Sequence, residues 1–189
     1  LYDAASNETA IISITNVAGG NALESGDQSV TLTITDNESA PTVTLGTSAS
    51  SVAENGSDLT LTATLSVASF ADVIVTLTGS GTSTSGTDYA SLSTITISAG
   101  STTGTTAFNP TGDSVYEGSE TAIMAITNVT GGGATESGTQ SETITITDAD
   151  SAPTVTLSSN VTSVAEDGGT GTLTATLSIA TTADVTVEL

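Results

Sequence analysis

Apolar residues alternate with threonine and serine along much of this chain, and a two-residue period predicts β-strands rather than helices. The segment 59–65 reads LTLTATL, with apolar residues at the odd positions and threonine at the even ones. One face of such a strand packs into a core while the other meets water. The same alternation predicts core positions at Val73, Val75, Leu77, Ile95, Ile97, Ala122, Met124, Ile126, Ile144 and Ile146.

Clusters of glycine, asparagine and aspartate separate the predicted strands and indicate turns. These predicted turns span 54–58, 79–88, 99–104, 109–120 and 130–138. Aromatic residues make up only 3% of the chain, so the core must consist mainly of Val, Ile, Leu and Ala. About seven strands without a helical segment predict an all-β fold, a two-sheet antiparallel β-sandwich.

The chain also repeats itself. The sequence TDNESAPTVTL at 35–45 recurs as TDADSAPTVTL at 147–157, so equivalent residues lie 112 positions apart. A period of this length indicates tandem domains rather than a solenoid of short units. We expect the C-terminal part of one repeat at 1–37, a complete repeat at 38–149 and the N-terminal part of the next at 150–189, within a longer polypeptide.

Composition restricts the partners of the chain. Its 189 residues include 21 Asp and Glu but no Lys, Arg or His, so only metal cations, water or backbone N–H groups can neutralise the carboxylates. Nucleic acids and anionic membranes bind basic patches, and we expect neither as a partner of this segment. Without cysteine there are no disulfides and no thiolate ligands.

The same composition argues against catalysis. A serine nucleophile needs a neighbouring base, and His, Cys and Lys are all absent. Glu117 and Glu120 are the nearest approach to a glycosidase pair, but the chain has no Trp to stack on a sugar. We therefore predict that the chain is not an enzyme.

The carboxylates of the complete repeat concentrate in its predicted loops. Like charges that converge there repel one another, and a hard divalent cation removes that cost. Calcium takes six to eight oxygen ligands from carboxylates, carbonyls and water, so these loops are candidates for a calcium site. The alternative is a set of solvated acidic loops, because neither an EF-hand motif nor a GGxGxD nonapeptide is present.

Six segments, in order, resemble the Calx-beta repeat: VAENGSDLTLTATL, ADVIVTL, GTSTSGTDYASL, TITISAGSTTGTTAF, DSVYEGSETAIMAITNV and ETITITDAD. That family occurs in the regulatory loop of sodium–calcium exchangers, in integrin β4 and in large bacterial surface proteins. The resemblance implies tandem immunoglobulin-like sandwiches that bind calcium at one end, near the junction with the next repeat. It implies these ligands: Glu54, Asp88, Asp113, the Val115 carbonyl, Glu117, Glu120, Asp148 and Asp150.

The partial repeats match this ligand set less fully. Glu8, Asp36 and Glu38 correspond to Glu120, Asp148 and Asp150, while Glu166 begins the equivalent site of the third repeat. In an unbroken register, Leu1 takes the place of Asp113 and Ala5 that of Glu117. Gly112, Ser114 and Ala149 also replace aspartates that the family often carries, so we expect fewer ions or looser binding.

These features predict a structural or adhesive segment of a long extracellular repeat protein or surface filament, secreted by a bacterium and stiffened by calcium at its junctions. Pro41 and Pro153 follow the acidic turns and leave almost no linker between repeats. The predicted partners are neighbouring repeats of the same chain and identical chains in a filament. The alternative function is a calcium-sensing module whose inter-domain angle responds to the ion.

Overall fold

The computed structural model describes residues 1–3, 8–92 and 94–189, and every regular element among them is a β-strand. The strands are β1 (Glu8–Ser13), β2 (Ser29–Ile34), β3 (Thr42–Thr47), β4 (Ser51–Ala53), β5 (Leu59–Leu65), β6 (Val73–Gly81), β7 (Ile95–Ile97), β8 (Thr103–Phe108), β9 (Val115–Tyr116), β10 (Glu120–Thr130), β11 (Thr135–Glu136), β12 (Ser141–Thr147), β13 (Val155–Ser159), β14 (Leu173–Leu177) and β15 (Ala180–Thr181). No helix in this described part is long and apolar enough to cross a membrane.

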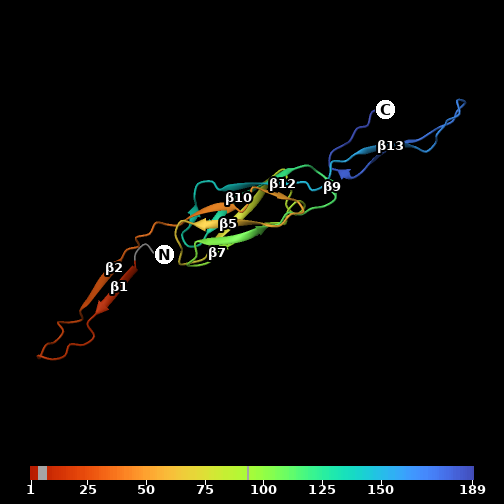
Figure 1. Ribbon diagram of the computed structural model, residues 1–189. Coiled ribbons are helices and arrows are strands. Elements are labelled where there is room, and N and C mark those ends of the chain that lie inside the picture. Colours follow the sequence, from red (N-terminus) through yellow and green to blue (C-terminus); the bar gives the residue numbers. More distant parts are fainter. Residues whose placement is uncertain (4–7, 93) are drawn as a thin grey trace.

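Strands β3 to β8 and β10 to β12 form a two-layer sandwich in the middle of the chain (Figure 1). One sheet has the order β4-β12-β10-β6-β7 and the other β11-β3-β5-β8. The long strands pair antiparallel, which confirms the predicted fold class. Two short edge strands depart from it, because β4 runs parallel to β12 and β11 parallel to β3. Strands of two or three residues are too short to show an alternation in sequence.

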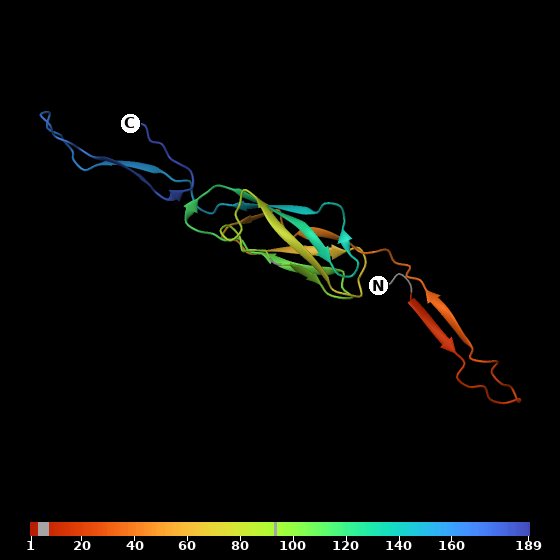
Figure 2. The same ribbon diagram turned by 180° about the vertical axis from the view of Figure 1, so that it is seen from behind.

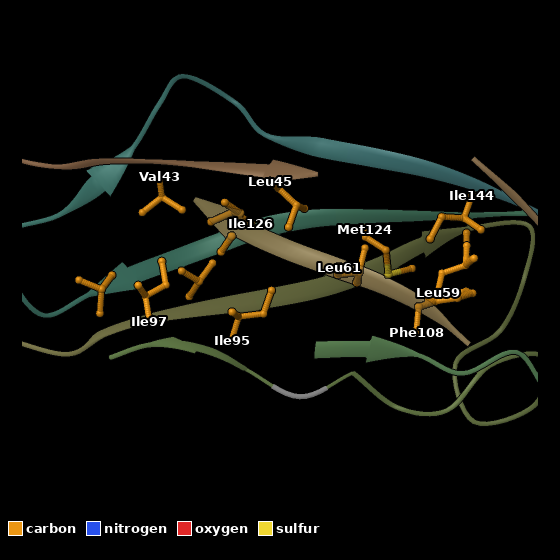
Figure 3. Packing of buried hydrophobic residues seen from close by; sticks show 14 of the residues in the cluster. Val43, Leu45, Leu59, Leu61, Ile95, Ile97, Phe108, Met124, Ile126 and Ile144 are labelled. Atoms are coloured by element: carbon orange, nitrogen blue, oxygen red, sulfur yellow. The ribbon is translucent and has the colours of Figure 1, made fainter. Parts of the chain in front are cut away.

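The core lies between these sheets and has the composition that the alternation predicts (Figure 3). In β5 the four odd positions from Leu59 to Leu65 are buried, while Thr60 and Thr64 are exposed. Each predicted core position is buried except Leu77, which packs against the cluster from its edge. Tyr89 and Phe108 are also part of the buried core, and their rings stack with centroids 5.1 Å apart.

The predicted turn at 79–88 is partly wrong, because β6 continues through Gly81 and pairs there with β10. Glycine serves close packing at this point rather than a turn. A Cβ on Gly79 would overlap the hydroxyl of Tyr89. Tyr89 fills the space that a side chain at position 79 would need, so the strand carries glycine there.

A β-hairpin extends from each end of the sandwich, β1–β2 from one and β13–β14 from the other, so the molecule is elongated (Figures 1 and 2). Strands β2 and β14 alternate apolar with polar residues, yet apolar side chains of the hairpins such as Ile12, Leu32 and Leu157 are at least half exposed. The reason is that, among the described residues, no second sheet packs onto either hairpin.

Candidate metal centre

Four loops meet at the end of the sandwich nearest β13, where Figure 1 also places β9. The parallel pairing of β4 with β12 sets the first contact. Ala53 pairs with Thr147, and the Glu54 N–H donates to the Thr147 carbonyl oxygen at 3.0 Å. The residues that follow this pair, Glu54 and Asp148, therefore leave the sheet side by side.

Glu54, Asp148 and Asp150 form the first carboxylate group, in which one oxygen of each residue lies within 4.8 Å of the others. Glu54 is only 7% exposed, and its Oε1 accepts a hydrogen bond of 3.1 Å from the Ala149 N–H. Asp148 Oδ1 accepts one of 2.8 Å from the Asp150 N–H. The loop after β12 thus wraps around its own aspartates.

One oxygen of this group has no hydrogen-bond partner. Asp150 Oδ2 is buried and accepts nothing from any described residue. A buried carboxylate oxygen without a donor carries a desolvation cost. A cation held by Glu54, Asp148 and Asp150 would supply the missing partner, so the first group fits a metal ion.

Asp88, Glu117 and Glu120 form the second carboxylate group, again with one oxygen of each within 4.8 Å of the others. Asp88 comes from the loop between β6 and β7 and is 8% exposed; its Oδ2 accepts a 2.6 Å bond from the Thr84 N–H. Glu120 opens β10, while Glu117 lies between β9 and β10. Carboxylates from separate loops therefore converge without any basic residue near them.

Burial, with like-charge crowding added to it, raises the pKa values of three of these carboxyl groups. Burial raises the pKa of Glu120 to about 7, and the charge of Asp88 adds to the effect. Burial also raises the pKa of Glu117, followed by repulsion from Asp88. The pKa of Glu54 is raised by burial and by the charges of Asp148 and Asp150, against the hydrogen bond from Ala149. The folded protein therefore resists ionising these carboxylates unless a cation balances them.

Asp148 behaves in the opposite way. Its Oδ2 accepts two bonds of 2.7 Å, from the N–H groups of Glu117 and Gly118. Desolvation raises the pKa of Asp148, but the bonds from Gly118, Asp150 and Glu117 outweigh it and hold the pKa below 3.8. Asp148 is therefore the ionised anchor that ties the acidic loop to the end of β12.

The structure brings six of the predicted ligand side chains into these two groups but leaves the Asp113 carboxylate outside both. Asp113 is exposed, and its Oδ1 accepts a 2.7 Å bond from the Val115 N–H in β9. Burial is the main cause of the raised pKa values of Glu54 and Glu117, and the charge of Asp113 makes a smaller contribution to both. Glu166 is exposed in a turn and joins neither group.

The first junction places Glu8, Asp36 and Glu38 around one cleft of about 210 Å³, together with Asp3. Asp36 Oδ1 accepts a 3.0 Å bond from the Glu38 N–H, as Asp148 does from Asp150. The backbone and side chain of Glu38 lower the pKa of Asp36, and the backbone of Asp3 contributes to the same effect.

Asp3 is a residue that the unbroken register missed. That register put Ala5, which lies outside the described residues, in the position of Glu117. The structure instead aligns Tyr2 with Tyr116, because each contacts the same loop of the following repeat. Asp3 then follows its tyrosine as Glu117 follows Tyr116. The shared pattern of tyrosine followed by a carboxylate was the available signal.

Fold and site together define a class: an acidic β-sandwich with carboxylate groups gathered at the end from which the next hairpin extends. The chain belongs to the LapA domain family, whose model matches residues 39–151. This family is adhesin-related.

Two solved structures are similar to the chain. The crystal structure of the apo-form Calx CBD1 domain is 18% identical, covers 58% of this chain and 99% of that one, and has a TM-score of 0.49. The crystal structure of CBD12 from CALX1.2 is 17% identical, covers 56% of this chain and 44% of that one, and has a TM-score of 0.47. No curated protein matches the chain.

Proposed function

We propose that the chain is a structural, adhesive segment of a long extracellular repeat protein or surface filament, stiffened by calcium bound at its inter-repeat junctions. Membership of an adhesin-related family supports the adhesive role. The observation that carries the calcium role is the buried Asp150 Oδ2, which lacks a partner inside a group of three carboxylates.

Glu54, Asp148 and Asp150 would hold one ion, and Asp88, Glu117 and Glu120 a second. All six supply hard carboxylate oxygens, the ligand type that calcium prefers. A bound ion would balance the repulsion that raises the pKa values of Glu54, Glu117 and Glu120. Its mechanical effect would reach the next repeat, because β9 adjoins Glu117 and pairs with β15.

The remaining parts of the proposal follow from charge. With 21 carboxylates and no basic side chain, the segment offers nucleic acid and anionic membranes no attractive surface. Together with membership of an adhesin-related family, this supports a location outside a bacterial cell, with neighbouring repeats and identical chains as the partners of the segment. A role in catalysis is not part of this proposal, since no base accompanies its serines.

Thermal unfolding tests the calcium site directly. At free calcium ten times the dissociation constant, a ligand that binds only the folded state adds about 1.4 kcal/mol of stability. For a domain of this size we expect the melting temperature to rise by several degrees over that in EGTA. Circular dichroism near 200 nm follows the loss of the sheets.

Magnesium at the same concentration is the control. It carries the same charge but requires a tighter octahedral site. A rise with calcium well above that with magnesium supports a dedicated site. Equal shifts for both ions would mean that the cations only screen the negative charge. No shift with calcium would mean that the carboxylates are solvated and bind no ion.

A further inference from the structure

The two junctions share a contact that does not involve carboxylates. At each one, a tyrosine that precedes a hairpin or a long strand pairs its backbone with a short segment of the following repeat. The segments are 68–70 and 180–182, which correspond through the 112-residue period. This recurrence within one chain indicates a common docking mode.

At the first junction the contact is a parallel β-bridge between Tyr2 and Ser69. The Tyr2 N–H donates to the Ala68 carbonyl oxygen at 2.8 Å, and the Phe70 N–H donates to the Tyr2 carbonyl oxygen at 2.8 Å. Ser69 itself is 1% exposed, and its carbonyl oxygen accepts a bond from Gly100 within the sandwich. The receiving segment is therefore fixed to its own repeat before the tyrosine arrives.

A glycine loop receives the ring of this tyrosine. A Cβ on Gly133 would lie 2.7 Å from Tyr2 Cε1 and 3.0 Å from its hydroxyl oxygen. Gly133 has a φ of +66°, which a residue with a side chain adopts only with strain. Both the space and the backbone conformation at 133 thus suit a glycine beneath an aromatic ring.

The second junction repeats the contact with other side chains. Thr181 pairs in parallel with Tyr116, and the Thr182 N–H donates to the Tyr116 carbonyl oxygen at 3.4 Å. Thr182 occupies the position of Phe70 in the period, and Thr181 that of Ser69. Because these receiving side chains differ, the shared element is the backbone pairing to a tyrosine.

Loop length does not explain the recurrence. Five residues separate Tyr2 from Glu8, whereas three separate Tyr116 from Glu120. A rigid copy of one loop could not place both tyrosines on equivalent segments. The pairing therefore holds although the chain between tyrosine and strand differs by two residues.

We propose that Tyr2 and Tyr116 are docking residues, through which each repeat binds the 68–70 segment or its equivalent in the next repeat. The partner is thus a second repeat of the same chain. Both contacts use backbone donors and acceptors, to which the Tyr2 ring on Gly133 adds at the first junction, so they orient the repeats without a metal. This docking goes beyond the proposed calcium role.

Amide hydrogen exchange of the 189-residue chain in EGTA tests the docking. The Phe70 N–H should be protected, because its acceptor is Tyr2. A Tyr2→Gly variant removes the ring and frees the backbone, and we expect exchange of the Phe70 amide to become about five- to tenfold faster. The Ser66 amide, which donates to Thr42 inside the sandwich, should keep its rate.

Two further variants separate docking from a general loosening. Tyr2→Phe keeps the ring and should leave Phe70 protected, while Tyr116→Gly should accelerate the Thr182 amide but not that of Phe70. An unprotected Phe70 amide in the unaltered chain, or the same rate in Tyr2→Gly, would overturn the proposal. Since EGTA is present throughout, a failed calcium site cannot produce either result.

Discussion

Replacing Asp148 with alanine should lower the calcium-free unfolding free energy by about 3 kcal/mol and remove the part of the calcium stabilisation that comes from the ion of the first group. Asp148 accepts hydrogen bonds from the N–H groups of Glu117, Gly118 and Asp150. Bonds to a charged acceptor contribute about 1.5–3 kcal/mol each, and water replaces part of that loss in a half-buried loop. Urea denaturation in EGTA and in calcium measures both effects.

Asp58→Ala is the matched control for Asp148→Ala. Asp58 belongs to the turn after Glu54, and its Oδ2 accepts a 2.6 Å bond from the Asn109 side chain. It belongs to neither carboxylate group. The control should therefore keep the full calcium response. An undiminished calcium response in Asp148→Ala, or a reduced one in Asp58→Ala, would contradict the assignment of the site.

Acid should remove the contribution of Asp148 in the unaltered protein as well. Its pKa in the folded state is held below the ordinary 3.8. A group with a lowered pKa stabilises the fold above its unfolded pKa and loses that effect as the pH falls through the folded value. The difference between the unaltered chain and Asp148→Ala should therefore shrink below about pH 3.8.

The core could be predicted from sequence because its physical cause is local. A strand with one buried face must alternate, and in β5 the alternation of leucine or alanine with threonine coincides with the buried positions. Gly79 shows the limit of this reasoning. Its role depends on Tyr89, ten residues away, and nothing in the local pattern reveals that a tyrosine hydroxyl occupies the space of the missing side chain.

The acidic residues of the site could be predicted, but their division into two groups could not. Glu54 joins Asp148 only because β4 pairs in parallel with β12, and a three-residue strand leaves no readable pattern. Asp113 shows that closeness in sequence is not sufficient either: it lies four residues before Glu117 but belongs to neither group. Which loops adjoin is a property of the sheet order.

Asp3 was missed for another reason. The 112-residue register is unbroken in the strands, and extending it into the loop before β1 put Ala5 where a carboxylate was sought. Loops accept insertions that strands do not, because a strand must keep its pairing partners. The tyrosine contact, rather than the count of residues, identifies the equivalent positions.

Glu120→Gln should stabilise the calcium-free protein at pH 8 and lose much of that advantage when calcium is bound. Burial and Asp88 raise the pKa of Glu120 to about 7, while the unfolded chain ionises near the ordinary 4.5. A raised pKa stabilises the fold below the unfolded value, and this effect is lost as the pH rises through the folded value. At pH 8 in EGTA, glutamine removes an unfavourable charge, and we expect a gain on the order of 2 kcal/mol after allowance for solvent screening.

Calcium should shrink this difference. An ion in the second group needs the Glu120 carboxylate, and glutamine offers only a neutral oxygen, so the variant should gain less stability from calcium than the unaltered chain. Melting in EGTA at pH 5 and pH 8 isolates the charge, because the advantage of the variant should be small at the lower pH. Glu142→Gln, in β12 and outside both groups, should shift neither curve. If the Glu120→Gln chain were less stable than the unaltered chain at pH 8 in EGTA, the Glu120 carboxylate would not be destabilised by burial and the charge of Asp88.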